Sequence, residues 1–206
     1  MRYKRKEYNK TDLLDGEDEI LKRCALIEVL SKNIKSIPST RFVFLSDSLV
    51  YLQEYVNKRS LHGISVGVLR LLINNLAQDL DIVNSTNFVH GDINFCNVIF
   101  DGTALCLIDL EPSIFQFKAG RQIIKSGYSF RSSNDVKNNK ITFETDKMGF
   151  YFFCEKSRNM AIDHFPKYRI PDFRGDDVTS MKIREEFIVK MSFVEIFESV
   201  FDIPHA

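Results

Sequence analysis

Apolar residues recur at helical spacing in four segments of the chain. Asp12 or Asp15 is a candidate N-cap for the first helix, and Pro38 ends it. Its buried stripe is predicted to consist of Leu13, Ile20, Cys24, Ile27, Leu30 and Ile34. The other three predicted helices span Ile64–Ile82, Asp146–Met160 and Ile183–Phe201. The last of them has an apolar stripe of Ile183, Phe187, Met191, Val194, Phe197 and Phe201, which is typical of core packing.

Shorter apolar and β-branched runs predict strands. Residues 1–8 form one candidate strand, and Arg41–Leu45 and Leu49–Val56 form a hairpin around Ser46-Asp47-Ser48. A second hairpin is predicted from Val98–Phe100 and Ala104–Ile108. The Asp101-Gly102 pair between these two runs predicts a tight turn, in which both residues adopt positive φ.

The second hairpin should bring two polar side chains together. Asn97 directly precedes its first strand, and Asp109 directly follows its second strand. Because the two ends of a hairpin lie side by side, we expect these residues to be close in space although they are 12 positions apart in the sequence.

The stretch around this hairpin contains the parts of a phosphoryl-transfer site. It reads FVHGDINFCNVIFDGTALCLIDLEPS from Phe88 to Ser113. Asp92 lies in a short loop, where it can accept the proton of an acceptor hydroxyl. Asn97 and Asp109 offer oxygen ligands to Mg²⁺, with Glu111 as a further candidate ligand. His90 is expected to orient the loop through hydrogen bonds.

Composition narrows the class of protein. The 206 residues contain 28 basic and 28 acidic side chains, so net charge predicts no nucleic-acid partner. No stretch is apolar for long enough to predict a membrane span. The four cysteines have no CxxC spacing and lie in or beside apolar segments. They are interpreted as small core residues of a reducing compartment, which predicts a cytoplasmic protein.

The motifs VHGDINFCNVIFD and CLIDLE resemble the catalytic and metal-binding loops of the protein-kinase-like superfamily. The form of the motifs is most similar to aminoglycoside phosphotransferases, choline kinases and lipopolysaccharide-core sugar kinases. This resemblance implies an α+β, two-lobed kinase-like fold that uses ATP and Mg²⁺. It implies Asp92 as catalytic base, with His90 and Asn97 in the catalytic loop, and Asn97 and Asp109 as metal ligands.

The resemblance also assigns roles to upstream residues. Residues 1–56 would be a reduced nucleotide-binding lobe, and 57–206 a mainly helical catalytic lobe. The segment LVYLQEYVNKRSL resembles the strand and hinge beside the adenine, with candidate contacts at Gln53, Tyr55 and Val56. Lys4 and Lys6 are candidates for the lysine that pairs with a helix glutamate. Glu17 is its first candidate partner, and the competing candidates are Glu19 and Glu28.

Three functions are compatible with these motifs. No glycine-rich segment lies before Glu17, and no D-F-G follows the second hairpin. The first function is a kinase that phosphorylates a hydroxyl of a small molecule or saccharide. The second is a minimal protein kinase, and the third is a catalytically impaired binding module. A reduced small lobe also makes pairing with a second copy or a partner chain a candidate arrangement.

Overall fold

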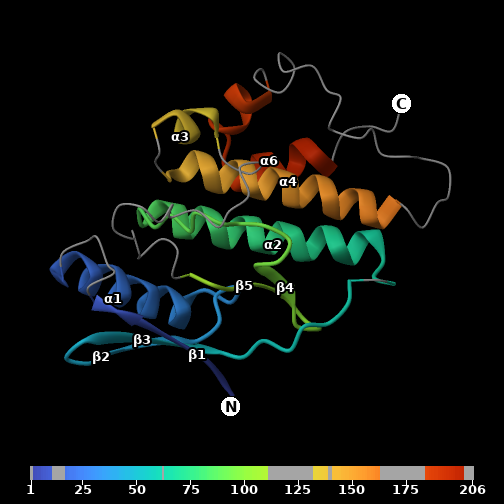
Figure 1. The fold of residues 1–206 in the computed structure, drawn as a ribbon. Helices are drawn as coiled ribbons and strands as arrows, with labels where there is room; N and C mark the ends of the chain where they lie inside the picture. The colour runs from blue at the N-terminus through green and yellow to red at the C-terminus, as the bar shows by residue number, and fades with distance from the viewer. Residues whose placement is uncertain are drawn as a thin grey trace.

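The computed structural model describes residues 2–10, 17–61, 63–110, 132–138, 141–162 and 184–201 (Figure 1). Within these ranges, the side chains of Glu17, Val136 and residues 159–162 are not described. The described elements are β1 (Tyr3–Asn9), α1 (Glu17–Asn33), β2 (Thr40–Phe44), β3 (Ser48–Glu54), α2 (Val66–Ser85), β4 (Val98–Phe100), β5 (Leu105–Leu107), α3 (Ser133–Asn138), α4 (Phe143–Ile162) and α6 (Phe193–Phe201). All of the predicted strands and the first three predicted helices are present.

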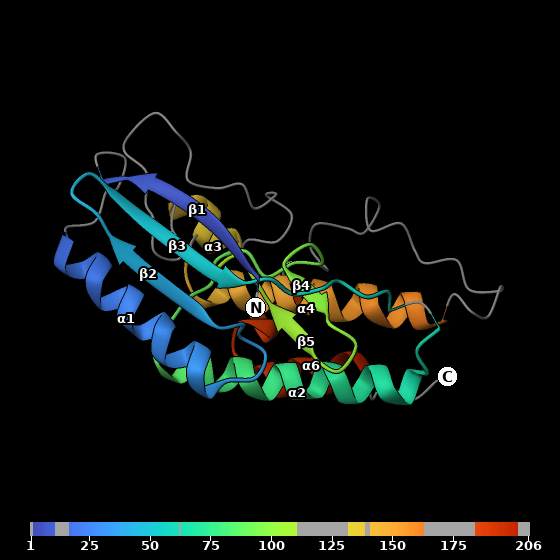
Figure 2. The same ribbon diagram turned by 90° about the horizontal axis from the view of Figure 1, so that it is seen from below.

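The first four elements form a sheet with one long helix beside it (Figure 2). The three strands are antiparallel in the order β1-β3-β2, which places β1 at one edge. Five residues of the predicted stripe of α1 are buried: Ile20, Cys24, Ile27, Leu30 and Ile34. The helix was therefore placed correctly by its apolar spacing, while its predicted start lies outside the described residues.

The register of the sheet decides which side chains reach the site. Lys4 lies opposite Gln53, and Lys6 lies opposite Tyr51. Gln53 and Tyr51 are buried, whereas Arg5, the residue between the two lysines, is exposed on the other face. Successive strand residues point to opposite faces, so Lys4 and Lys6 share the inner face with Gln53 and Tyr51.

The β4–β5 hairpin lies between the sheet and α2 (Figure 1). Its turn differs from the predicted one. Gly102 has φ of 110°, but Asp101 does not have positive φ. The Asp101 carboxylate instead accepts hydrogen bonds from the backbone N–H groups of Thr103 and Ala104. This Asx-type arrangement produces a four-residue loop, and it explains why the Asp-Gly signal located the hairpin but not the turn type.

The remaining helices form a layer on the far side of the hairpin, in which α2 contacts both α4 and α6. Ser65 caps α2 by accepting a hydrogen bond from Val68 N. The predicted helix at residues 183–201 is wrong in one respect, because it is interrupted at residues 189–192 and Phe187 is exposed. Ser192 and Glu195 form a reciprocal capping box that starts α6. Among the described residues, no helix is both long and apolar enough to cross a bilayer.

Candidate active site

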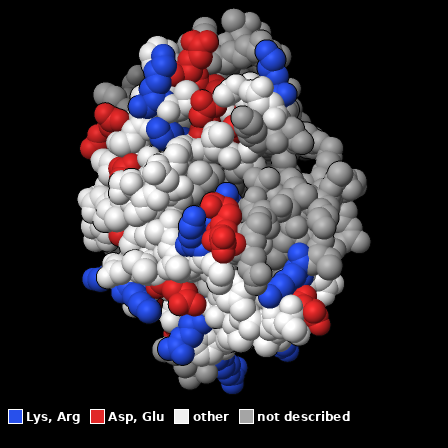
Figure 3. All heavy atoms as spheres, turned by 90° about the vertical axis from the view of Figure 1, so that its left-hand side faces the viewer, with Lys and Arg blue, Asp and Glu red and all other residues white. Residues whose placement is uncertain are grey.

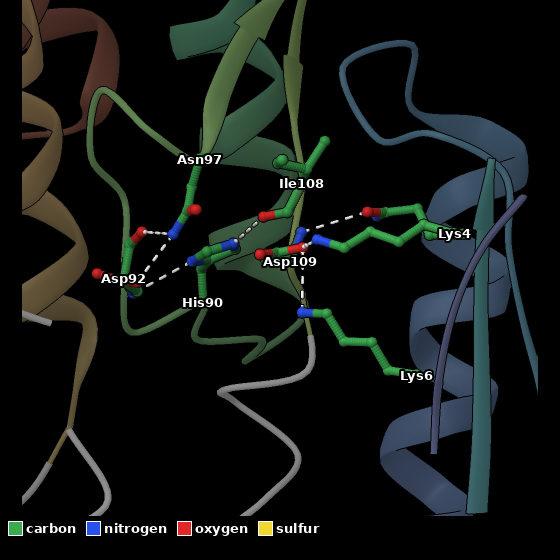
Figure 4. A network of polar contacts seen from close by, with 8 residues as sticks. Lys4, Lys6, His90, Asp92, Asn97, Ile108 and Asp109 are labelled. Atoms are coloured by element: carbon green, nitrogen blue, oxygen red, sulfur yellow. Dashed lines mark hydrogen bonds and ion pairs between the residues drawn. The ribbon is translucent and has the colours of Figure 1, made fainter. Parts of the chain in front are cut away.

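The loop between α2 and β4 holds His90, Asp92 and Asn97, and Asp109 follows β5 after one residue, Ile108 (Figure 4). The backbone N–H of Ile108 donates to the carbonyl of Asn97 at 2.8 Å. Asn97 and the residue before Asp109 are therefore joined at the open end of the hairpin. The proximity that the sequence predicts for Asn97 and Asp109 is present in the fold.

His90 connects the two loops of the site. Its Nε2 lies 2.9 Å from the carbonyl of Ile108, and its Nδ1 accepts a hydrogen bond from the backbone N–H of Asp92 at 3.1 Å. Accepting at Nδ1 places the proton on Nε2, which then donates to Ile108. Burial lowers the pKa of His90 to about 4, so the ring is neutral near pH 7. It is suited to positioning the loops, as the sequence predicts.

Two amides orient the carboxylate of Asp92. Asn97 Nδ2 donates to Asp92 Oδ2 at 2.8 Å, and Asn94 Nδ2 donates to Asp92 Oδ1 at 2.7 Å. Burial raises the pKa of Asp92, and these two hydrogen bonds offset part of that rise. A raised pKa makes the carboxylate a stronger proton acceptor, while the amides restrict its direction.

Asn94 was not singled out from the sequence, yet it connects most of this loop. Its Nδ2 donates to Asp92, and its Oδ1 accepts from the backbone N–H groups of Cys96 and Asn97. The loop motif therefore holds two amide residues that act on one carboxylate. An Asn two positions after an Asp is a local signal for such side-chain-to-backbone bonding, and it would have been sufficient to find this residue.

Asp146, near the start of α4, is hydrogen-bonded to the backbone of the same loop. Its carboxylate accepts from the backbone N–H groups of His90 and Gly91 at 2.7 and 2.6 Å. The residue is buried, and burial raises its pKa to about 7 against the opposing effect of these two donors. Gly91 has φ of 81°, a left-handed conformation that favours glycine, so it can present its N–H to Asp146.

Asp109 contacts the small sheet through two lysines. Its Oδ1 lies 2.7 Å from Lys4 Nζ and 3.3 Å from Lys6 Nζ (Figure 4). Burial raises the pKa of Asp109, but the two lysines outweigh burial, so the pKa lies below its ordinary value. Asp109 also has φ of 59°, a strained conformation for a residue with a side chain. Strain of this kind is typical of functional positions.

Two of the three glutamates that are candidates for the predicted lysine–glutamate pair are bonded to other groups. Glu19 bonds to Arg23 within α1, and Glu28 accepts from the backbone N–H of Phe42. Glu17 begins α1, but its side chain lies outside the described residues, as does all of Glu111. Pairing of a lysine with Glu17 therefore stays a prediction. Lys4 and Lys6 both contact Asp109, and the sequence analysis did not predict this contact.

The three candidate adenine contacts lie at the end of β3 and just after it. Gln53 is buried, and its Oε1 accepts from the backbone N–H of Asp109 at 3.3 Å. The Tyr55 side chain is exposed, and its backbone N–H donates to the carbonyl of Arg2. Val56 is half-buried. Gln53 therefore reaches the site through its side chain, whereas Tyr55 lies at the surface.

The oxygen atoms at the open end of the hairpin suit Mg²⁺. Both acceptors of the Asn97 amide nitrogen belong to Asp92, so Asn97 presents its Oδ1 to the site. Asp109 adds a carboxylate. Among the described residues, no three His, Cys, Asp or Glu side chains gather into a metal cage. Mg²⁺ is usually held by one or two carboxylates together with substrate phosphates, so this donor set fits the ion.

The ion pair between Lys4 and Asp109 is partly exposed to solvent. Figure 3 shows that basic and acidic side chains also meet near the centre of one face of the molecule. The side chains of Lys4 and Asp109 are 43% and 24% exposed. An ion pair with this exposure can be opened by a competing ligand at modest energetic cost.

The cysteines are only partly as predicted. Cys24, Cys106 and Cys154 are buried, which agrees with their interpretation as core residues. Cys96 is exposed, so that interpretation is wrong for it. The backbone N–H of Cys96 donates to Asn94 Oδ1, so Cys96 belongs to the same hydrogen-bonded loop as Asp92 and Asn97.

Comparison with solved structures identifies the architecture. The Cydia pomonella granulovirus kinase PK-1 matches with a TM-score of 0.59 over 97% of this chain and 84% of that chain, at 10% sequence identity. The chain has a protein-kinase-like fold. No protein family and no curated protein matches the sequence itself.

In the kinase-like fold, β1, α1, β2 and β3 form a reduced small lobe, and the helical layer forms the large lobe. The α+β class predicted from the sequence is confirmed. The division at residues 56 and 57 remains a prediction. Residues 55–60, which contain no helix or strand, connect the small sheet to the segment that leads into α2.

Proposed function

We propose that this chain is an ATP- and Mg²⁺-dependent phosphotransferase that acts on a hydroxyl of a small molecule or saccharide. The observation that carries the proposal is the joint placement of Asp92, Asn97 and Asp109, with His90 bonded to both loops. A hydroxyl acceptor needs a proton acceptor beside the metal-binding oxygens, and these residues supply both.

In this proposal each residue of the site has a defined task, and Asn97 has two. Asp92 receives the proton of the acceptor hydroxyl, and Asn94 and Asn97 hold its carboxylate in one direction. Asn97 and Asp109 would hold Mg²⁺, which supplies charge neutralisation at the transferred phosphoryl group when bound. His90 keeps the base and the metal-binding loop in register, and Asp146 fixes the backbone beneath them.

The finer assignment within kinase-like enzymes rests on the sequence. The I-D-x-E form at Ile108–Glu111 and the lack of D-F-G favour the type of aminoglycoside phosphotransferases and choline kinases over protein kinases. We propose ATP contacts at Gln53, Tyr55 and Val56, with Tyr55 and Val56 contributing backbone groups. A protein hydroxyl is the alternative acceptor.

A second candidate function has one observation in its favour. Both lysines of β1 are ion-paired to Asp109, the residue that would hold the metal. A kinase-fold binding module without turnover would leave these pairs closed. Retention of Asp92, Asn97 and Asp109 in bonding positions favours the enzyme.

Nucleotide binding and turnover test the two candidates separately. We expect millimolar Mg²⁺ and ATP to raise the melting temperature, and Asp109→Ala to abolish the rise. Asp92→Asn should keep the rise but lose phosphate transfer to pools of sugars, lipid-linked sugars and small alcohols. Asp47→Asn is the matched control, because its carboxylate is exposed and, within the described part of the chain, bonds only to Ser46. Absence of any rise in the wild-type protein would favour the binding module, and transfer to a protein pool alone would change the acceptor class.

A further inference from the structure

The solvent-exposed face of α2 contains no charged side chain. The structure describes the whole helix, and its exposed residues are Val66, Gly67, Val68, Leu71, Asn75, Gln78, Ile82 and Ser85. The exposed residues of α1 include four charged ones: Asp18, Glu19, Lys22 and Lys32. A helix at the surface of a globular protein normally carries its charged residues on the outer face, as α1 does. Depletion of charge, as on the outer face of α2, is typical of the centre of an interface.

The charged residues of α2 are instead bonded to other parts of the protein. Arg70 donates to the carbonyl of Phe201 at 3.1 Å. Asp79 accepts from the backbone N–H of Ser36 at 3.0 Å. Asp81 accepts from two backbone N–H groups at the start of α6. These three are all the charged residues of the helix, so its charges serve contacts within the chain and its outer face is left uncharged.

The outer face of α2 forms one stripe along an edge of the molecule (Figure 2). Its large apolar side chains Val68, Leu71 and Ile82 are 48%, 59% and 54% exposed. Single exposed apolar residues are ordinary, whereas several on one face mark an interaction surface. Steps of three or four residues place the members of this stripe on the same side of the helix: Val68, Leu71, Asn75, Gln78 and Ile82.

The stripe has the same chemistry when it is followed from either end. Val68 and Leu71 are apolar at one end, Ile82 is apolar at the other, and the amides of Asn75 and Gln78 lie between them. Asn75 is midway between Val68 and Ile82 in the sequence. In two antiparallel copies related by a two-fold axis at Asn75, Val68 of each copy faces Ile82 of the other. The central amides can then donate to and accept from one another.

We propose that the stripe from Val68 to Ile82 is a self-association surface, on which two copies of this chain pair through antiparallel α2 helices. A strongly charged partner would find no complementary charge here, whereas a second copy offers apolar and amide groups at the matching positions. The stripe is about 21 Å long and about 10 Å wide. This is small beside the about 800 Å² that each partner buries in a standard interface, so the dimer is reversible, with a dissociation constant on the order of 10 to 100 μM.

This pairing leaves the candidate active site open. Other faces of α2 pack against β5, α4 and α6, so the stripe faces away from the hairpin that positions Asn97 and Asp109. The surface also lies on the helical layer and not on the reduced small lobe. The inference is independent of the proposed function, because association is measured without nucleotide or acceptor.

Sedimentation velocity of the purified chain from about 5 to about 500 μM tests the surface. We expect the average mass to rise from the 23.9 kDa of one chain toward twice that value. Val68→Lys and Ile82→Glu should each weaken association at least about tenfold, because each places a charge against an apolar side chain of the other copy. Val29→Glu in α1 is the matched control, since Val29 is 54% exposed, as Ile82 is, and should leave association unchanged.

A mixture of the two variants tests the antiparallel geometry. The lysine introduced by Val68→Lys then faces the glutamate introduced by Ile82→Glu in the other copy, so the mixture should form dimers although each variant alone is monomeric. A mixture that stays monomeric would overturn the antiparallel arrangement. Wild-type chain that is monomeric at about 500 μM, or association that survives both single changes, would overturn the surface itself. Unchanged thermal unfolding of the variants at low concentration shows that they are folded.

Discussion

The two sides of the site hold their polar groups in opposite ways. On the large-lobe side, His90, Asp146 and Asn97 are buried. Their side chains bond to the backbone of Ile108, His90 and Asp92, respectively. On the small-lobe side, Lys4 and Lys6 reach Asp109 by long side chains that are 43% and 29% exposed. The loop from His90 to Asn97 is therefore held by buried hydrogen bonds, while the lysine side chains can adjust. In the proposed function, the proton acceptor needs a fixed direction and the groups near the phosphates need adjustable charge.

The largest effect on stability is expected when Asp146, on the large-lobe side of the site, is replaced. Asp146→Ala leaves the buried N–H groups of His90 and Gly91 without an acceptor. We expect the free energy of unfolding to fall by about 3 kcal/mol or more, measured by urea denaturation. The loss should be accompanied by loss of turnover. An unchanged denaturation midpoint would show that the loop does not depend on this brace.

The next largest expected effect is the change of stability with pH that comes from protonation of His90. Its folded pKa of about 4 lies below the ordinary 6.5, so the unfolded chain binds the proton more readily. Stability from this group is present above about pH 6.5 and is lost as the pH falls toward 4, by about 3 kcal/mol. Asp146 acts in the opposite direction, because its raised pKa of about 7 favours the folded state at lower pH and removes stability as the pH rises through 7.

Because the two groups oppose each other, the prediction is tested on His90 alone. An NMR titration of its ring, assigned by the loss of its signal in His90→Gln, should show a midpoint near pH 4. A midpoint near 6.5 would contradict the buried, neutral ring and with it the bridge to Ile108.

Two helix glycines, Gly149 and Gly67, test how closely α4 packs against the loop. Gly149 in α4 packs against the backbone carbonyl of Ile93, and an added Cβ would collide with that oxygen. Gly149→Ala should therefore lower the free energy of unfolding by about 2 kcal/mol and reduce turnover, although alanine favours helices. Gly67→Ala is the control, because Gly67 lies in α2 with open space around it. It should raise stability by about 0.5 kcal/mol. Equal effects of the two changes, measured by thermal unfolding, would rule out close packing of α4 on the loop.

Substitution of Lys4 or Lys6, on the small-lobe side of the site, should have the smallest effect on stability. Lys4→Gln and Lys6→Gln are each expected to change the free energy of unfolding by less than about 1 kcal/mol, since partly exposed ion pairs contribute little. Urea denaturation of both variants checks this. A loss as large as that of Asp146→Ala would mean that the lysines hold the lobes together and are not free to move.

The sequence predicted those features that depend on local pattern. Apolar spacing located α1, α2 and α4, and the hairpin signal brought Asn97 next to Ile108. The sequence analysis assigned no contact to Asp146, because its partners lie 55 and 56 residues away. The contact of Lys4 with Asp109 spans 105 residues and depends on the register of β1 against β3. Pairing over such distances is decided by tertiary packing, which no local pattern encodes.

Two predictions were wrong because another local signal was given more weight than a polar side chain that bonds to the backbone. The apolar stripe across residues 183–201 hid the capping box at Ser192 and Glu195, which starts a new helix. In the second hairpin, the Asp-Gly pair predicted positive φ at both residues, yet the Asp101 side chain bonds to the loop and favours a longer turn. In both cases a polar side chain bonded to backbone and changed the outcome.

The outward-facing Cys96 makes this loop open to site-specific labelling. The other three thiols are buried, and burial raises the pKa of each, to about 12 for Cys24 and Cys106. Thiolate is the reactive form, so a maleimide dye should attach at Cys96 well before the others. A fluorophore would then lie directly beside Asn97. If the proposed function is correct, changes in its emission would report binding of metal, nucleotide or acceptor to the unmutated chain.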